Sequence, residues 1–399
     1  MKTRHANRRE FVATVACALA ATSVRGAEPD FTPLHVAVGE HMEKLGIPGG
    51  QIAVGRGNRI LFSRAIGMAD GLKKTPVKTQ TLFRIASISK SLTAVAVLGA
   101  VEEGALSLDD KMLEVLKPDI FVPAGVAVDS RLKEITIRHL LQHTAGWDRG
   151  KSGDPMFQST QIAKALGIGG PPTTREVVRE VLGRPLDTAP GARYVYSNFG
   201  YCVLGRVLEK IYAKPYDEII KVRVLRPMGV ARPQLGSTLT PAEDETRYFM
   251  RQNDGEARSV FPESPGRVPW PYGGFCLEMM DAHGGWLAAG EDIVRFATSL
   301  DDIGGRSPFK KRETYEAMIA PPPGVEKADY YACGFVIRRS GKRVAMSHDG
   351  SLPGTSSFFK RRADGLAWAA LFNMRDEGGT RDGAIVEAID RALDEIFRR

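Results

Sequence analysis

The segment Ser87-Ile88-Ser89-Lys90 places an amine three residues after a hydroxyl group. The residues that follow, Leu92 to Val101, are apolar almost all round, which predicts a buried helix that ends at Gly104. A serine in the first turn of a helix lies near unpaired N–H groups and the positive end of the helix dipole. A lysine three positions later lies on the same face and can help to deprotonate the hydroxyl, if burial or neighbouring charge lowers its pKa. The pair therefore predicts a serine nucleophile.

Ser-x-x-Lys alone is a weak signal, because the chain also contains Ser130 to Lys133 and Ser307 to Lys310. Neither of these segments opens a buried apolar helix, so we interpret both as chance matches. On this motif alone, Ser87 is equally well explained as a helix cap, since serine is a favoured N-cap residue.

Two later motifs carry side chains that could take part in the same chemistry as Ser87 and Lys90. Tyr196-Ser197-Asn198 precedes an apolar helical pattern and is typical of a capping loop. Alternatively, the tyrosine hydroxyl carries a proton and the asparagine amide binds a substrate; a tyrosine near two cations is expected to have a lowered pKa and to act as a general base. His348-Asp349-Gly350 lies at the end of an expected strand and is followed by Ser351. A glycine there permits close approach of a substrate to the strand edge.

In this order and at these separations, the three motifs resemble those of the serine β-lactamase and penicillin-binding-protein superfamily. The sequence is most similar to the branch of class C β-lactamases, D-aminopeptidases and family VIII esterases, over roughly residues 31–399. Four further segments read like that branch: Phe83 to Ala86, Ile135 to Gly146, Tyr196 to Tyr201 and Gly284 to Trp286.

The resemblance implies acyl transfer, with Ser87, Lys90 and Tyr196 as the catalytic residues. Ser87 would attack a carbonyl, and Lys90 and Tyr196 would share the proton; which of the two is the general base stays open. Among the substrate-binding residues, Asn198 would hold the acyl part. The oxyanion would lie between the backbone N–H groups of Ser87 and Ser351, just after Gly350. No metal or cofactor is implied.

His348 would occupy the place that many β-lactamases give to a lysine. A histidine is only partly charged near neutral pH, which favours an esterase, amidase or peptidase over a dedicated β-lactamase. We therefore expect a serine hydrolase that forms an acyl-enzyme with an ester, amide, peptide or β-lactam. The alternatives are a β-lactamase or D-alanyl-D-alanine carboxypeptidase proper, and a penicillin-binding receptor that is acylated without turnover.

The elements that must position these residues come from both ends of the chain. An amphipathic pattern over residues 31–46 predicts a helix, and Gln51 to Val54 and Arg59 to Ala65 predict a hairpin around Gly57-Asn58. The far end predicts two more hairpins and a closing helix with four apolar residues on one face. These residues are Ile385, Ile389, Leu393 and Ile396.

The expected fold class is α/β (α+β), β-lactamase/transpeptidase-like. A mainly antiparallel sheet with flanking terminal helices would come from both chain ends, about residues 30–80 and 330–399. A helical part would come from about residues 81–329, within one domain spanning 28–399. The polar segment Pro241 to Gly274 reads as a long loop or insertion. We hypothesise that it walls the cleft and influences substrate choice.

Residues 1–27 are expected to be an export signal. The segment Asn7 to Val12 resembles a twin-arginine motif, and the apolar run Phe11 to Val24 is followed by the small residues Gly26 and Ala27. The run is short and rich in alanine, so we expect no integral membrane span in the mature chain. An exported, periplasmic or secreted bacterial protein is therefore predicted.

The formal net charge of +8 does not indicate nucleic-acid binding, because much of it lies in this N-terminal segment and no later Lys/Arg run is interleaved with aromatics. A small-molecule or peptidoglycan-derived substrate is the expected partner; the oligomeric state is not indicated. Cys202 is expected in the core, and three mature cysteines make a poor disulfide framework. His139 and His143 have metal-ligand spacing but no third ligand, so packing or capping roles are favoured.

Overall fold

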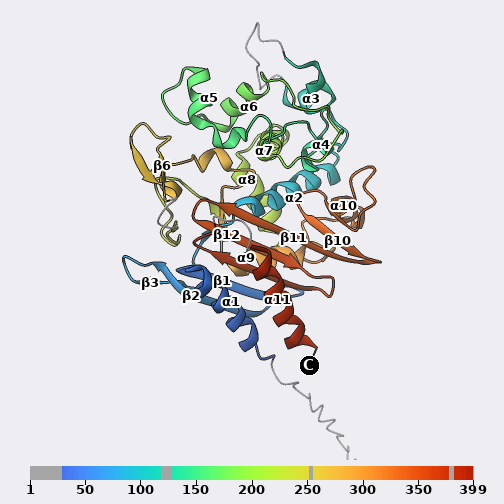
Figure 1. Cartoon of the computed structure of the whole chain (residues 1–399). Coiled ribbons are helices and arrows are strands. Elements are labelled where there is room, and N and C mark those ends of the chain that lie inside the picture. Colours follow the sequence, from blue (N-terminus) through green and yellow to red (C-terminus); the bar gives the residue numbers. More distant parts are fainter. Residues whose placement is uncertain (1–28, 118–127, 251–254, 377–381, 399) are drawn as a thin grey trace, which may run out of the picture.

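The computed structural model describes residues 29–117, 128–250, 255–376 and 382–398, so the expected export signal, with Cys17, lies outside the described residues. In the described part of the chain, eight strands form an antiparallel sheet in the order β3-β2-β1-β13-β12-β11-β10-β9 (Figure 1). This order places β1 beside β13, so both chain ends build one sheet, as predicted. The strands are β1 (Gly49–Arg56), β2 (Arg59–Asp70), β3 (Thr75–Pro76), β9 (Asp329–Tyr331), β10 (Val336–Ser340), β11 (Arg343–Leu352), β12 (Thr355–Arg361) and β13 (Leu366–Phe372).

The N-terminal hairpin forms where the sequence predicts it. Arg56 pairs with Arg59 across the turn, and the two central residues, Gly57 and Asn58, have φ values of 53° and 63°. Two successive positive φ angles define the turn type whose twist matches paired strands, and glycine and asparagine tolerate them best. The strands are longer than the apolar runs that predicted them, because pairing continues into mixed segments.

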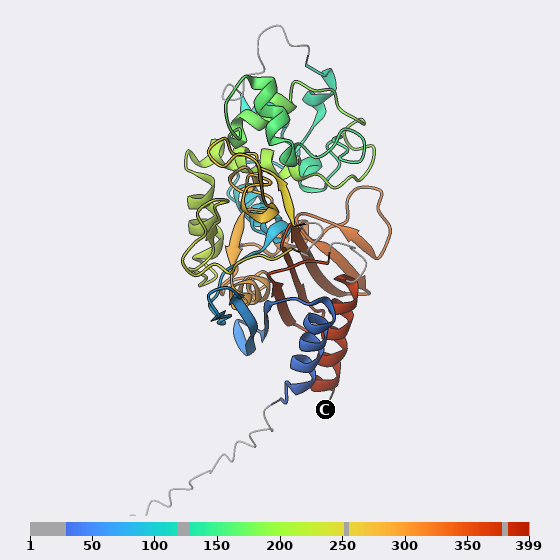
Figure 2. The same ribbon diagram turned by 60° about the vertical axis from the view of Figure 1, so that its left-hand side comes forward.

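Two terminal helices, α1 (Thr32–Leu45) and α11 (Asp382–Phe397), lie side by side on one face of the sheet (Figures 1 and 2). Helix α1 ends at Gly46, whose φ of 66° is the left-handed conformation that favours glycine. The apolar stripe predicted for the closing helix is confirmed, since it packs with α1 and the outer face of the sheet in one core cluster. Its members include Leu34, Val38, Met42, Trp368, Ile385, Ile389 and Leu393.

The opposite face of the sheet carries α9 (Gly290–Ser299) and the larger core cluster. Helix α9 comes from the middle of the chain, which the sequence assigns to the helical part, yet it packs against β1 and β13. The remaining helices gather beyond this face, above the sheet in Figure 1. They are α2 (Ser89–Glu102), α3 (Met112–Leu116), α4 (Ile137–Leu141), α5 (Ser159–Leu166), α6 (Thr174–Val181), α7 (Asn198–Tyr212), α8 (Tyr216–Ile220) and α10 (Arg312–Met318).

Short elements connect these parts. Three of them form a small sheet in the order β4 (Phe83–Arg84), β8 (Trp286–Ala288) and β5 (Gln234–Leu235), while β6 (Glu256–Arg258) pairs with β7 (Arg267–Pro269) inside the expected insertion. The short turns are η1 (Ala86–Ile88), η2 (Ser130–Glu134), η3 (Pro155–Phe157), η4 (Lys221–Leu225), η5 (Trp270–Tyr272) and η6 (Glu278–Met280). No described helix is both long and apolar enough to cross a membrane.

The three cysteines in the described part of the chain are buried and form no disulfide. Cys202 lies in the core, as predicted. Burial raises the pKa of each thiol to about 12, so none of them is activated as a thiolate.

Candidate active site

Ser87 lies in the η1 turn between strand β4 and helix α2. The sequence predicts it in the first turn of the helix; instead, it is in the 3-10 turn that leads into that helix. The preceding residue, Ala86, has a φ of 46°, which is a strained value for a residue other than glycine. Ser87 is half-buried while its neighbours Ala86 and Ile88 are buried, so its hydroxyl lies at an accessible point of an otherwise buried turn.

The side chain of Ser87 does not cap helix α2. Its Oγ accepts a hydrogen bond from Nζ of Lys90 at 3.1 Å. The helix-cap alternative is therefore not supported, and the hydroxyl and the amine are in direct contact, as the spacing predicts.

Lys90 is fully buried, and its Nζ also donates a hydrogen bond to the backbone carbonyl of His283 at 2.8 Å. Burial lowers the pKa of Lys90 well below its usual value, because the ammonium loses its hydration. The carboxylate of Asp154 opposes this effect, while the Arg149 guanidinium adds to it. The neutral amine is thus favoured and can accept a proton.

Two basic residues lie beside Tyr196, which the sequence hypothesis requires. The Lys90 Nζ atom and the Arg149 guanidinium carbon are each 4.9 Å from the centre of its ring. The expectation of a lowered pKa is nevertheless wrong: burial raises the pKa of Tyr196, and this outweighs the opposing effects of the Ser87 hydroxyl and Arg149. The hydroxyl therefore stays protonated near neutral pH.

His348 is uncharged near neutral pH rather than partly charged. It is 4% exposed, and burial lowers its pKa to about 4. Its Nδ1 lies 2.6 Å from the backbone oxygen of Asp349, which can only accept a hydrogen bond, so Nδ1 carries the proton. Nε2 accepts from the Tyr331 hydroxyl at 3.1 Å. This motif also lies within strand β11, which continues to Leu352, rather than at a strand end.

Gly350 brings strand β11 against the turn that carries Ser87. A Cβ atom at this position would lie 2.2 Å from the backbone oxygen of Ile85 and 2.3 Å from Oγ of Ser357. The Ser357 hydroxyl itself donates to that Ile85 oxygen at 2.8 Å. The sequence predicts a glycine here for substrate approach; the close neighbour in the structure is the chain's own backbone. Ser351 is exposed and pairs with Ser356 in the sheet, and its oxyanion role stays a prediction.

Asn198 opens helix α7 and is 8% exposed. Its Nδ2 donates to Oδ2 of Asp154 at 2.6 Å. The preceding residue, Ser197, caps the helix by accepting from the N–H of Gly200, as expected for a capping loop.

Two histidines that the sequence assigns to packing or capping make such contacts. His139 Nδ1 accepts from the backbone N–H of Thr136 at the start of α4, completing a capping box. His143 accepts the N–H of Val195 with its carbonyl at 2.8 Å and the N–H of Ser197 with its Nδ1 at 3.1 Å. His143 therefore holds the backbone on both sides of Tyr196.

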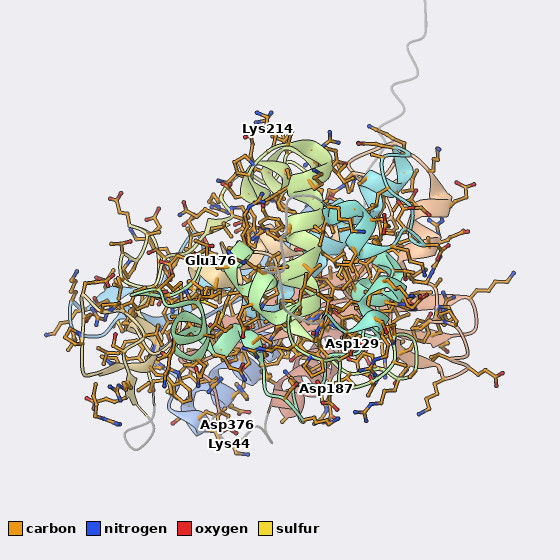
Figure 3. All side chains as sticks on the ribbon, turned by 90° about the horizontal axis from the view of Figure 1, so that it is seen from above. Lys44, Asp129, Glu176, Asp187, Lys214 and Asp376 are labelled. Atoms are coloured by element: carbon orange, nitrogen blue, oxygen red, sulfur yellow. The ribbon has the colours of Figure 1, made fainter. Side chains whose placement is uncertain are left out.

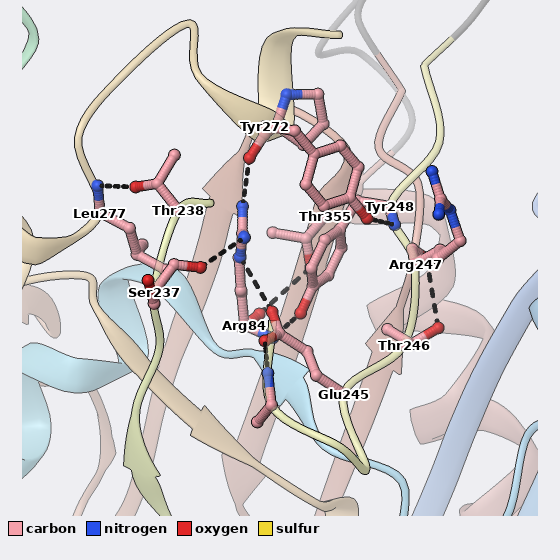
Figure 4. A network of polar contacts seen from close by, with 12 residues as sticks. Arg84, Ser237, Thr238, Glu245, Thr246, Arg247, Tyr248, Tyr272, Leu277 and Thr355 are labelled. Atoms are coloured by element: carbon pink, nitrogen blue, oxygen red, sulfur yellow. Dashed lines mark hydrogen bonds and ion pairs between the residues drawn. The ribbon is translucent and has the colours of Figure 1, made fainter. Parts of the chain in front are cut away.

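The segment Pro241 to Gly274 is tied to the strand before Ser87 (Figure 4). The fully buried Arg84 donates from Nε to Glu245 at 3.1 Å and from Nη1 to the carbonyl of Pro271 at 2.8 Å. Its guanidinium also lies 4.4 Å from the ring centre of Tyr248.

The same region packs against the turn itself. Ala86 shares a core cluster with Phe275 and Leu352, and the half-buried Trp270 packs on this cluster. The insertion therefore packs, through Trp270, on the cluster that includes Ala86 of this turn, while its effect on substrate choice stays a prediction.

Sequence reasoning missed Asp154, Arg149, Tyr331 and the carbonyl of His283. Two of them had a nearby signal: His283 directly precedes the matched segment Gly284 to Trp286, and Arg149 follows the segment Ile135 to Gly146 by three residues. Asp154 and Tyr331 lie outside every motif and reach the site through long-range folding.

The Beta-lactamase family model matches residues 36–391 of the chain. The chain therefore belongs to the Beta-lactamase family, a family of serine hydrolases, as its motifs predict.

Among its relatives, penicillin-binding protein 4* of Bacillus subtilis is 25% identical over 355 residues, covering 86% of this chain and 72% of the relative. Esterase EstB of Burkholderia gladioli is 31% identical over 231 residues, covering 55% of this chain and 54% of EstB. The chain thus spans about half the length of several curated relatives that it matches. The structure of the D-amino acid amidase of Ochrobactrum anthropi SV3 shares the fold, with a TM-score of 0.69, 23% identity and coverage of 91% of this chain and 97% of the amidase.

The close approach of Gly350 to the backbone of Ile85 predicts that an added side chain at position 350 destabilises the fold. Gly350→Ala is expected to lower the free energy of unfolding by about 1–3 kcal/mol or more, because the new methyl group must displace the backbone at Ile85. Chemical denaturation measures this change. Gly39→Ala is the matched control: Gly39 lies in α1 with no atom within 4 Å of the added Cβ, and this change should raise stability by up to about 1 kcal/mol. Equal effects of both changes would contradict the prediction.

Proposed function

We propose that this chain is a serine hydrolase that transfers the acyl group of an ester or amide to Ser87 and then to water. The observation that carries the proposal is the hydrogen bond between the half-buried Ser87 hydroxyl and the fully buried Lys90 amine. Burial lowers the pKa of the Lys90 amine, so this amine is a suitable acceptor for the serine proton.

In the proposed acylation, neutral Lys90 takes the proton of Ser87 as Oγ forms a bond to the substrate carbonyl carbon. The carbonyl electrons move to the oxygen, which the backbone N–H groups of Ser87 and Ser351 are proposed to stabilise. As the bond to the leaving group breaks, Tyr196 donates its hydroxyl proton to that group and regains one from the Lys90 ammonium. The acyl-enzyme and the neutral amine remain.

Deacylation runs through the same groups in reverse. A water molecule loses a proton to Lys90 through Tyr196 and attacks the acyl carbon. The collapse of the tetrahedral intermediate breaks the Oγ–carbon bond, and the proton returns to Ser87. The raised pKa of Tyr196 favours Lys90 as the base and Tyr196 as the proton carrier.

The uncharged state of His348 supports a substrate without a carboxylate at that position. A neutral, fully bonded imidazole offers no fixed cation, so esters and amides are favoured over substrates that need one there. The esterase among the relatives and the amidase among the structural neighbours are compatible with this class.

A receptor that is acylated without turnover is the alternative, favoured by the match with penicillin-binding protein 4* over 86% of this chain. Steady-state turnover, in contrast to a single stoichiometric burst, separates the two. Export through residues 1–27 also stays a prediction, which cell fractionation of the full chain would test.

Ser87→Ala is expected to abolish hydrolysis of a short-chain p-nitrophenyl ester, because it removes the attacking oxygen. The matched control is Ser130→Ala, which removes the exposed serine of a second Ser-x-x-Lys segment. Initial rates over a range of ester concentrations measure the effect. Equal activity in both variants would reject Ser87 as the nucleophile. A stable acyl adduct without turnover in the unmodified chain would favour the receptor.

The rate constant kcat/KM is expected to fall as the pH drops through the pKa of Lys90, because the protonated amine cannot accept the serine proton. In Tyr196→Phe, kcat should fall about 100-fold or more, because proton transfer to the leaving group is lost. The acid limb of the pH–rate profile should keep its position. A pH–rate profile of both proteins checks this. Loss of the acid limb in Tyr196→Phe would identify Tyr196 as the base instead.

A further inference from the structure

Asp154 is a carboxylate at the candidate site that belongs to none of the motifs. Its Oδ1 accepts from the N–H of Met156 and thereby caps the η3 turn, while its Oδ2 accepts from Nδ2 of Asn198 at 2.6 Å. No lysine or arginine in the described ranges forms an ion pair with it. One carboxylate thus bonds to a backbone cap and to a predicted substrate-binding amide.

The contact fixes the orientation of the Asn198 amide. An ionised carboxylate can only accept hydrogen bonds, so the NH₂ group of Asn198 must face Asp154. The amide oxygen then points the other way, where it is buried and accepts no hydrogen bond from the described residues. A bond to an ionised acceptor is among the stronger hydrogen bonds in proteins, so it resists a flip of the amide.

Asp154 also acts on Lys90. Of the charged groups around this buried amine, Asp154 exerts the largest effect, and it raises the pKa that burial lowers. Asp349 acts in the same direction more weakly, and Arg149 acts against both. The carboxylate that orients Asn198 therefore also contributes to how readily Lys90 is protonated, against the larger effect of burial.

We propose that Asp154 is a positioning residue of this site, because it bridges the η3 turn and the Asn198 amide and holds that amide in one orientation. The inference rests on the proposed acyl-transfer function. It distinguishes Asp154 from an ordinary turn cap, which would require only the bond to Met156.

Two variants separate these roles. Asp154→Ser keeps a favoured cap residue but removes both the charge and the reach to Asn198. Asp154→Asn removes the charge and leaves one side-chain oxygen in place of two, so it can accept from the N–H of Met156 or from Nδ2 of Asn198, but not from both as the carboxylate does. Asp129→Asn is the matched control, because Asp129 caps η2 through the N–H of Arg131 and contacts none of the motif residues (Figure 3 labels Asp129 beside Asp187).

The readouts are the rate of Ser87 labelling by a fluorophosphonate, which forms an Oγ–phosphorus bond with loss of fluoride, and KM for a p-nitrophenyl ester. Without the carboxylate, the Lys90 pKa falls further, so the acid limb of labelling should move to lower pH in both Asp154 variants. KM should rise about ten-fold or more in Asp154→Ser, and less in Asp154→Asn. Asp129→Asn should keep the wild-type limb and KM.

If both Asp154 variants keep the wild-type acid limb and KM, the carboxylate is only a cap and the inference is wrong. Absence of Ser87 labelling in the unmodified, folded chain would overturn the proposed function, and this inference with it. Labelling of the unmodified chain together with an unchanged KM in both Asp154 variants would overturn the inference alone. Rates are compared per folded protein, with the folded fraction taken from circular dichroism at each pH.

Discussion

The burial of the Lys90 amine beside Ser87 is the constraint on which the rest of the site depends. An ammonium removed from water costs several kcal/mol unless it is paired, and Lys90 makes hydrogen bonds only to a hydroxyl and a carbonyl in the described structure. The amine therefore tends toward its neutral form, which is the form that can take a proton from Ser87. Helix α2 creates this environment because eleven of its residues, Lys90 included, are buried.

A strained turn needs support from the structure around it, and η1 has support on two sides. Strand β11 packs closely against this turn because Gly350 has no Cβ atom. The hydroxyl of Ser357 on β12 donates a hydrogen bond to the carbonyl of Ile85. From the other side, Arg84 ties the strand before the turn to the segment Pro241 to Gly274 (Figure 4). Residues from the C-terminal sheet and from the insertion thus fix one serine, although they are distant in the sequence.

This arrangement explains which features the sequence could reveal. Ser87 and Lys90 interact within a single turn, so their spacing carries the signal, and the hairpins and terminal helices have local periodicities. Helix α9 has an equally regular apolar pattern, but such a pattern does not indicate against which other element the helix packs. Asp154 reaches Asn198 from 44 residues away, and no local rule relates the two.

The two electrostatic expectations that needed correction share one cause. The sequence suggests that cations lie near Tyr196 and shows which residue type occupies position 348, but it does not indicate how completely each group is buried. For Tyr196, desolvation outweighs the opposing effects of Arg149 and of the Ser87 hydroxyl; for His348, desolvation outweighs the charge and the hydrogen bond of Asp349, which act in the opposite direction.

These corrections lead to a consistent division of roles at the site. Tyr196 keeps its proton and suits proton transfer to a leaving group, which leaves Lys90 as the group able to accept a proton from Ser87. Lys90 and Arg149 are the basic residues beside Tyr196, and Lys90 is the one in contact with Ser87. A negative charge that acts on Lys90 opposes the effect of burial, and Asp154 is the largest such influence on the pKa of this amine.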